Sequence, residues 1–125
     1  MNILVVDDDA VHRLLLRAIF TAEQMNVVAA VDGVEALAAL EREPIDAIVT
    51  DILMPKMDGY ALVQRIRTDP KMRHIPVVFL SATYITPEDK AFALSLGAVR
   101  FLEKPVDTEE FLLTIAEILT GGPSN

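Results

Sequence analysis

Five short, β-branched runs alternate with segments of helical spacing along this chain, and that alternation limits the fold more than any other feature. The runs are apolar at successive positions, as is typical of strands covered by helices on both faces of a parallel sheet. They are Ile3–Val6, Val27–Val31, Ala47–Val49, Val77–Leu80 and the weaker Val99–Leu102, which Arg100 interrupts. The pattern predicts an α/β fold, an open parallel sheet built from five strand–helix units.

Apolar residues in the intervening segments recur at helical spacing, which predicts five amphipathic helices. Capping signals mark helix starts at Asp32, Thr86 and Asp107, and Gly97 is the predicted end of the fourth helix. The predicted core-facing residues are Leu14, Ala18 and Ala22; Ala36, Leu37 and Leu40; Leu62, Val63 and Ile66; Ala91, Leu94 and Ala98; and Phe111, Ile115, Ile118 and Leu119.

Length and composition set the broad class of the protein. Its 125 residues fit one domain, expected over residues 1–120, with residues 121–125 as a flexible tail or the start of a linker. The net charge of −8 argues against a nucleic-acid surface, and the absence of cysteine excludes disulfides and thiolate chemistry. No apolar run approaches the roughly 20 residues that span a bilayer. We therefore expect a cytoplasmic protein that binds neither nucleic acid nor membrane.

Polar residues that directly follow the strands are the candidates for chemistry, because ligands of an open α/β sheet bind at the carboxyl ends of its strands. Asp7 and Asp8 follow the first strand, Asp51 the third, Ser81 the fourth and Lys104 the fifth. If the first and third strands are neighbours, three carboxylates meet and repel one another unless a cation compensates them. Oxygen ligands without histidine or cysteine favour Mg²⁺. The metal, the Lys104 ammonium and the Ser81 hydroxyl would together hold a phosphoryl group.

Four motifs stand in order at these strand ends: Ile3-Leu4-Val5-Val6-Asp7-Asp8, Asp51-Ile52-Leu53-Met54-Pro55-Lys56-Met57-Asp58-Gly59, Leu80-Ser81-Ala82 and Lys104-Pro105. Together they resemble the receiver domain of two-component response regulators. The resemblance implies a flavodoxin-like (βα)5 fold, a doubly wound five-stranded parallel sheet with strand order 2-1-3-4-5. It also implies a phosphorylation switch in signal transduction rather than an enzyme, with no turnover beyond its own phosphoryl transfer and autodephosphorylation.

By that resemblance Asp51 would be the phosphoacceptor, taking a phosphoryl group from a histidine kinase or a phosphotransfer domain. Mg²⁺ or Mn²⁺ would be held by the side chains of Asp8 and Asp51 and by the main-chain carbonyl of Leu53. Asp7 would act near the metal through water. Lys104 would pair with the phosphoryl group.

Ser81 and Phe101 would form the switch that follows phosphorylation. Ser81 would hydrogen-bond the phosphoryl group in the active state, and Phe101 stands where the family carries its switching aromatic residue. The fourth helix, fifth strand and fifth helix would then present a changed face to a downstream protein or an output domain. The fifth helix carries no basic residue, which argues against a charge-paired dimer. Charged residues predicted on that face are Lys90, Arg100, Glu103, Glu110 and Glu117.

Two residues bear on how long the phosphoryl group persists. Leu53 and Thr83 come two positions after Asp51 and Ser81, near the path of an attacking water molecule. Because an apolar Leu53 cannot orient that water, we expect slower loss of phosphate than with Asn at this position.

Other polar residues near these motifs are predicted to cap helices, form turns or face solvent. Asp9 is expected to cap the first helix, Asp58-Gly59 to form a cap and turn, and His12 and His74 to be solvated. Arg13, Leu15 and the Pro105-Val106 step would flank the pocket. Leu15 is either a partly exposed docking residue or a packing residue.

Three other functions are alternatives to the phosphorylation switch. An aspartate-nucleophile phosphatase of the haloacid dehalogenase type is the main alternative, but it needs a second acid where this chain has Leu53. A flavodoxin-like nucleotide- or flavin-binding module would need a Gly- or Ser/Thr-rich phosphate loop where Asp7-Asp8-Asp9 stands. A degenerate receiver that serves only as a scaffold would lack part of the residue set, which is complete here.

Overall fold

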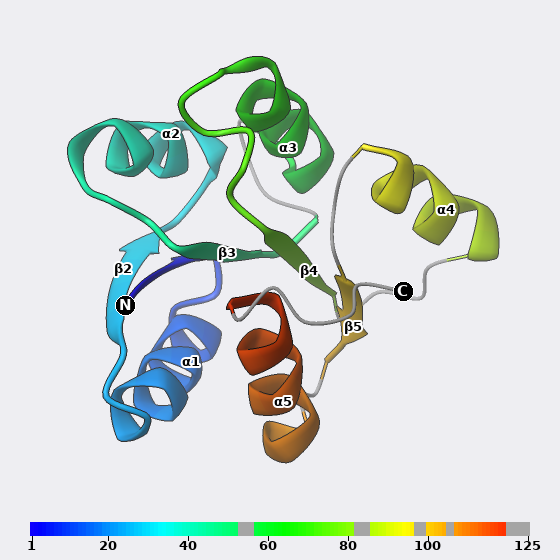
Figure 1. The fold of residues 1–125 in the computed structure, drawn as a ribbon. Coiled ribbons are helices and arrows are strands. Elements are labelled where there is room, and N and C mark those ends of the chain that lie inside the picture. The colour runs from blue at the N-terminus through cyan, green and yellow to red at the C-terminus, as the bar shows by residue number, and fades with distance from the viewer. Residues whose placement is uncertain (53–56, 82–85, 97–99, 105–106, 120–125) are drawn as a thin grey trace.

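The computed structural model describes residues 1–52, 57–81, 86–96, 100–104 and 107–119. Five parallel strands form a sheet in the order β2-β1-β3-β4-β5 (Figure 1). This is the flavodoxin-like order that the sequence predicts, and each predicted strand is confirmed to within one residue at either end. The strands are β1 (Asn2–Val6), β2 (Asn26–Ala30), β3 (Ala47–Thr50), β4 (Val77–Ser81) and β5 (Arg100–Glu103).

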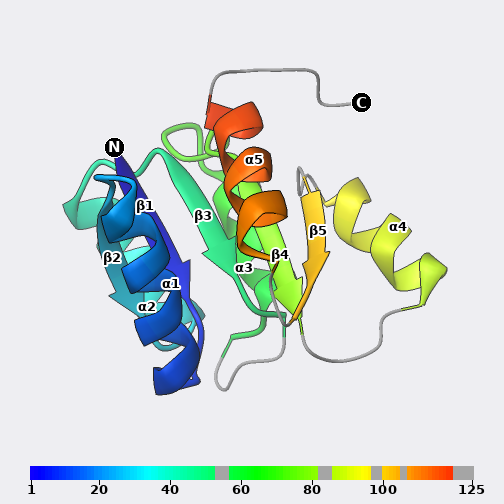
Figure 2. The same ribbon diagram turned by 90° about the horizontal axis from the view of Figure 1, so that it is seen from below.

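Helices cover both faces of the sheet, as Figures 1 and 2 show. Helices α1 (Ala10–Ala22) and α5 (Thr108–Leu119) lie on one face, and α2 (Gly33–Arg42), α3 (Gly59–Thr68) and α4 (Pro87–Ser95) lie on the other. Each face therefore has its own apolar core, one including Phe20 and Phe111 and the other including Ile48, Leu62 and Phe79. Among the described residues, no helix is both long and apolar enough to cross a membrane.

Side-chain caps determine where the helices begin. Asp9, Asp32, Asp58 and Thr86 each accept a hydrogen bond from a main-chain N–H in the first turn of the helix that follows. Asp107 does the same for α5. These bonds satisfy N–H groups that have no partner within the helix, and they confirm the predicted caps. The predicted role of Gly97 lies outside the described residues.

Helix α1 turns a different side to the sheet than its apolar spacing predicts. Its buried residues are Leu16 and Phe20, whereas Leu14 is 68% exposed and Ala18 and Ala22 are also exposed. The prediction was wrong because α1 carries two stripes at i, i+4 spacing on different sides. Spacing identifies such stripes but does not say which one contacts the sheet.

The predicted core face of the shorter helix α4 is also wrong. Ala93 is its buried residue, while Ala91 and Leu94 are exposed and the predicted Ala98 lies outside the described residues. The predicted core faces of α2, α3 and α5 are confirmed, since each contains buried residues of the expected set.

The register of the sheet brings the strand ends to one edge. Val6 pairs with Thr50, and the Asp51 N–H then donates to the Val6 carbonyl oxygen at 2.9 Å. On the other side of β4, the Lys104 N–H donates to the Ser81 carbonyl oxygen at 2.9 Å. The residues that follow β1, β3 and β5 therefore leave the sheet at its carboxyl edge, where the sequence places the chemistry.

Candidate functional site

Three carboxylates meet at the carboxyl edge of the sheet. Asp7 and Asp8 follow β1, Asp51 follows β3, and one carboxylate oxygen from each lies within 4.8 Å of the others. This confirms the predicted neighbourhood of β1 and β3. Burial differs among the three, since Asp7 is buried, Asp51 is partly buried and Asp8 is exposed. Asp8 therefore presents its carboxylate to solvent while the other two are set into the edge of the sheet.

Lys104 bridges two of these acids. Its Nζ lies 2.9 Å from Asp7 Oδ2 and 3.3 Å from Asp51 Oδ2, and its side chain is 13% exposed. Burial lowers the pKa of the Lys104 ammonium, but the hydrogen bond to Asp7 and the charge of Asp51 outweigh that effect and raise the pKa above its usual value. The residue is therefore a fixed positive charge in the site.

Asp7 is the most heavily hydrogen-bonded acid of the cluster. Its Oδ1 accepts from the Asp9 N–H at 2.9 Å, and its Oδ2 contacts both Lys104 Nζ and His12 Nδ1, the latter at 2.6 Å. Burial raises the pKa of the Asp7 carboxyl, but the hydrogen bonds from His12, Lys104 and Asp9 outweigh it, and the pKa falls to about 2. Asp7 is thus a carboxylate although it is only 2% exposed.

Two residues of α1 contact the site: Arg13, which the sequence places beside the pocket, and His12, whose contact the sequence does not predict. His12 was expected to be solvated, but its side chain is 11% exposed and it pairs with Asp7. Arg13 Nη1 donates to the main-chain oxygen of Asp7 at 2.6 Å. Both residues stand in the first turn of α1, which the Asp9 side chain caps. Their position five and six residues after Asp7 was the signal available in the sequence. His74 is exposed, as expected.

The main chain around Asp51 is closely packed. Asp51 Oδ1 accepts from the Ile52 N–H at 2.7 Å, and the Gly59 N–H donates to the Ile52 carbonyl oxygen at 2.7 Å. A β-carbon added to Gly59 would lie 2.5 Å from the Asp51 carbonyl oxygen. Gly59 therefore allows the main chain of Asp51 to pack closely against the start of α3. It also stands directly after the Asp58 cap, as the sequence predicts. The predicted contribution of Leu53 lies outside the described residues.

Ser81 and Phe101 lie on β4 and β5, the two strands that follow β3 in the sheet. Ser81 ends β4 and is buried. Partly buried Phe101 on β5 begins a row of aromatic rings, with Phe79 at 6.3 Å between centroids, Tyr60 5.5 Å from Phe79, and Phe92 5.4 Å from Tyr60. Of the other predicted site residues, Thr83 and Pro105-Val106 lie outside the described ranges.

The α4–β5–α5 face carries the charged residues that the sequence places there, and four of them form ion pairs. Lys90 Nζ lies 3.5 Å from Glu103, and Arg100 Nη2 lies 3.2 Å from Glu117. Leu15, on α1, is 47% exposed, which agrees with a docking residue but does not identify a partner.

The donor set of the carboxylate cluster suits a hard divalent cation. Asp7, Asp8 and Asp51 offer only oxygen, and Lys104 supplies one positive charge to three acids. Magnesium prefers such oxygen ligands and commonly keeps several of its waters. Asp7 is buried and its Oδ2 already accepts from both His12 and Lys104, whereas each Asp51 oxygen accepts one hydrogen bond and Asp8 is exposed. Asp8 and Asp51 are therefore the acids better placed to bind a metal directly.

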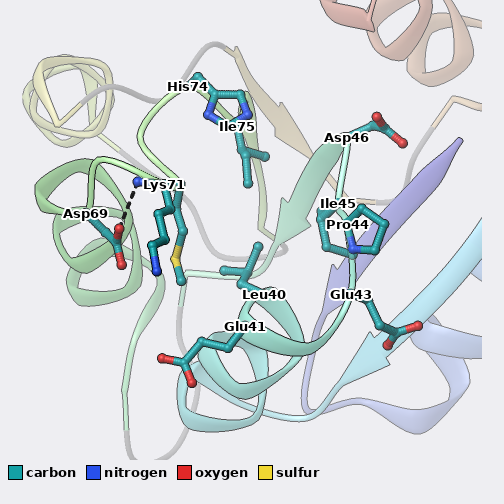
Figure 3. A pocket seen from close by; sticks show the side chains of 11 residues that line it. Leu40, Glu41, Glu43, Pro44, Ile45, Asp46, Asp69, Lys71, His74 and Ile75 are labelled. Carbon is teal, nitrogen blue, oxygen red and sulfur yellow. Dashed lines mark hydrogen bonds between the residues drawn. The ribbon is translucent and has the colours of Figure 1, made fainter.

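A separate cavity of about 650 Å³ lies at the opposite edge of the sheet (Figure 3). Its walls come from the segments that precede β3 and β4, including Ile45, Asp46 and Ile75. Asp69 and Lys71 join across a turn at its rim, where the Lys71 N–H donates to Asp69 at 2.8 Å. The cavity shares no lining residue with the carboxylate cluster.

Comparison with known proteins agrees with this geometry. The chain matches the family described as the response regulator receiver domain over residues 3–116. An uncharacterized 14.6 kDa protein of Leptolyngbya boryana is 41% identical over 98% of this chain and 93% of its own length. The response regulator PleD of Caulobacter vibrioides is 44% identical over 85% of this chain, but the matched part is only 23% of PleD.

Solved structures give the same result. The receiver domain of a sensor histidine kinase from Pseudomonas aeruginosa superposes with a TM-score of 0.84 at 30% identity, covering 97% of this chain and 98% of that one. That structure has a magnesium ion coordinated in its active site cleft.

Proposed function

Because this chain belongs to the response regulator receiver domain family, we propose that it is a phosphorylation switch whose acceptor is Asp51. The observation that carries the proposal is the position of Lys104 Nζ, 3.3 Å from Asp51 and 2.9 Å from Asp7. An ammonium fixed beside a carboxylate in an acidic cluster can balance the charge of a phosphoryl group that joins that carboxylate.

The proposed reaction is phosphoryl transfer to a carboxylate oxygen of Asp51. The oxygen attacks phosphorus, a P–O bond forms, and the bond from phosphorus to the donor breaks, with the electron pair leaving on the donor. The donor is the phosphohistidine of a histidine kinase or of a phosphotransfer domain. Lys104 stabilises the added negative charge, and Ser81 donates a hydrogen bond to a phosphoryl oxygen. The product is an acyl phosphate on Asp51.

Asp8, Asp51 and the main-chain carbonyl of Leu53 would hold Mg²⁺ or Mn²⁺, with Asp7 acting through water. Support comes from the all-oxygen donor set and from the magnesium ion in the Pseudomonas aeruginosa relative. When bound, the metal supplies positive charge that neutralises the phosphoryl oxygens during transfer. The residues of the chain orient the reacting groups around it.

The proposed output is a change of the α4–β5–α5 face. Movement of Ser81 toward the phosphoryl group leaves room behind β4, and Phe101 turns inward to fill it. A downstream protein or an output domain would then bind the changed face. Residues 1–120 form the receiver domain of this cytoplasmic protein in our proposal, with residues 121–125 as a tail or the beginning of a linker.

Incubation with acetyl phosphate and Mg²⁺ tests the proposed function. Wild type should gain about 80 mass units, the mass of one phosphoryl group, and only when Mg²⁺ is present. Asp51→Asn should gain no mass. Mass spectrometry of the intact chain, with mapping of the modified residue, measures both. An unlabelled wild type would contradict the proposal. Rapid multiple turnover of phosphate esters would instead favour an aspartate-nucleophile phosphatase.

A further inference from the structure

His12 is a contact of the cluster to which the proposed phosphoryl chemistry gives no role. Its Nδ1 lies 2.6 Å from Asp7 Oδ2, and its side chain is 11% exposed. A carboxylate only accepts hydrogen bonds, so Nδ1 carries the proton and donates it to Asp7. The other ring nitrogen, Nε2, is buried and has no hydrogen-bond partner among the residues that the structure describes. Among the described residues, Asp7 is therefore the hydrogen-bond partner of the His12 ring.

Asp7 Oδ2 has a second donor that phosphorylation would draw away. Lys104 Nζ is shared between this oxygen at 2.9 Å and Asp51 Oδ2 at 3.3 Å. In the proposed function, Lys104 pairs with the phosphoryl group on Asp51, and we expect its donation to Asp7 Oδ2 to weaken as the ammonium moves toward that group. Asp7 is 2% exposed, and water cannot readily replace a donor lost from a buried carboxylate.

The remaining contacts of Asp7 hold other atoms. The Asp9 N–H donates to Oδ1 at 2.9 Å, and Arg13 Nη1 donates to the main-chain oxygen at 2.6 Å. Neither contact reaches Oδ2, so among the described residues His12 and Lys104 are the donors that hold this oxygen directly. His12 stands on α1, which the proposed switch leaves in place.

We propose that His12 is a positioning residue, which holds the Asp7 carboxylate in one orientation toward the metal while Lys104 exchanges Asp7 for the phosphoryl group. The inference rests on the proposed function, in which Asp7 acts near the metal through water. Hydrogen-bond partners of this kind, one step removed from a metal, commonly change metal affinity by about 10- to 100-fold when they are lost.

Metal binding tests the inference with a matched set of variants. His12→Leu removes the donor and should raise the Mg²⁺ dissociation constant, measured by titration calorimetry, by about 10-fold. His12→Asn places an amide donor near the position of Nδ1 and should restore most of the affinity. His74→Leu changes the other, exposed histidine and should leave the affinity at the wild-type value. Unchanged affinity in His12→Leu, or equal loss in His12→Asn and His12→Leu, would overturn the inference.

The same variants separate positioning from general damage to the fold. With acetyl phosphate, His12→Leu should require a higher Mg²⁺ concentration for half-maximal labelling while keeping most of the rate at saturating Mg²⁺. A lower rate at saturation with no change in the Mg²⁺ requirement would contradict a positioning role. If wild type is labelled and His12→Leu has the same Mg²⁺ requirement as wild type, this inference alone is overturned. If wild type is not labelled, the proposed function is contradicted.

Nitrogen-15 NMR of the two histidines gives a test that needs no variant. His12 should show the Nδ1–H tautomer, with a proton on Nδ1 in a strong hydrogen bond. A His12 ring in the Nε2–H tautomer could not donate to Asp7 through Nδ1 and would overturn the inference.

Discussion

Gly59 packs directly against the main chain of Asp51, so that a β-carbon on Gly59 would lie 2.5 Å from the Asp51 carbonyl oxygen. The same carbon would lie 2.9 Å from the Phe79 ring. Because a carbonyl oxygen cannot swing aside as a side chain can, we expect Gly59→Ala to displace the acceptor segment. The free energy of unfolding should fall by about 1–3 kcal/mol, measured by urea denaturation. Labelling of Asp51 should slow as well.

Gly33→Ala is the matched control for that variant. A β-carbon on Gly33 would lie 2.7 Å from the β- and γ-carbons of Met57, and the Met57 β-carbon cannot rotate away. We expect a comparable loss of stability but a smaller effect on labelling, because this contact does not involve the main chain of Asp51. Equal stability of wild type and Gly59→Ala would contradict the packing argument.

Removing the bridging ammonium should impair the chemistry more than the fold. Lys104→Met keeps much of the side-chain length but leaves Asp7 and Asp51 without the cation between them. Loss of one preorganised charge donor in an active site costs about 100- to 1,000-fold in rate. We expect a slowing of that order in acetyl phosphate labelling under saturating Mg²⁺. Lys71→Met, at the distant cavity, should label at the wild-type rate.

The stability of the protein should depend on the ionisation of Asp7 at low pH. The folded-state pKa of Asp7, about 2, lies below its usual value of 3.8, so ionised Asp7 stabilises the fold above pH 3.8. That contribution is lost as the pH falls from 3.8 through 2. In metal-free buffer, wild type should lose about 2 kcal/mol more than Asp7→Asn between pH 5 and pH 2. Urea unfolding at several pH values measures the difference, and parallel pH profiles would contradict the assigned partners of Asp7.

Leu53 should prolong the life of the acyl phosphate. It stands two residues after Asp51 in the sequence, and an apolar side chain there cannot orient an attacking water molecule. Leu53→Asn should therefore lose its phosphoryl group several-fold faster than wild type. Decay of the label after removal of acetyl phosphate measures this, and an unchanged decay rate would refute the prediction.

The sheet could be predicted from the sequence because its strands lie between two layers of helices. Runs such as Ala47–Val49 and Val77–Leu80 are apolar at every position, and that condition is seldom met outside a buried strand. Helix caps such as Asp32 could also be predicted from the sequence, because a cap is a local hydrogen bond between one side chain and one nearby main-chain N–H. The meeting of the acids at the ends of β1 and β3 could be predicted on the condition that these two strands are neighbours.

What the sequence could not provide depends on tertiary placement. Leu14 and Leu16 are both apolar residues of α1, and only the packing of α1 on the sheet decides that Leu16 is buried. His12 resembled a surface histidine because its contact with Asp7 depends on the turn that Asp9 makes between β1 and α1. The five-residue spacing between Asp7 and His12 does not by itself reveal a hydrogen bond that depends on this turn.

The direction of α5 has a consequence for how a signal could leave the domain. In Figure 2 the strands run toward the edge where Asp51 lies, and α5 runs back the opposite way, so Leu119 is at the amino edge of the sheet. Any segment attached beyond α5 begins at the far end of the molecule from the acceptor. It would sense phosphorylation through the length of the domain, by a change of shape carried over a distance, and not by touching the phosphoryl group.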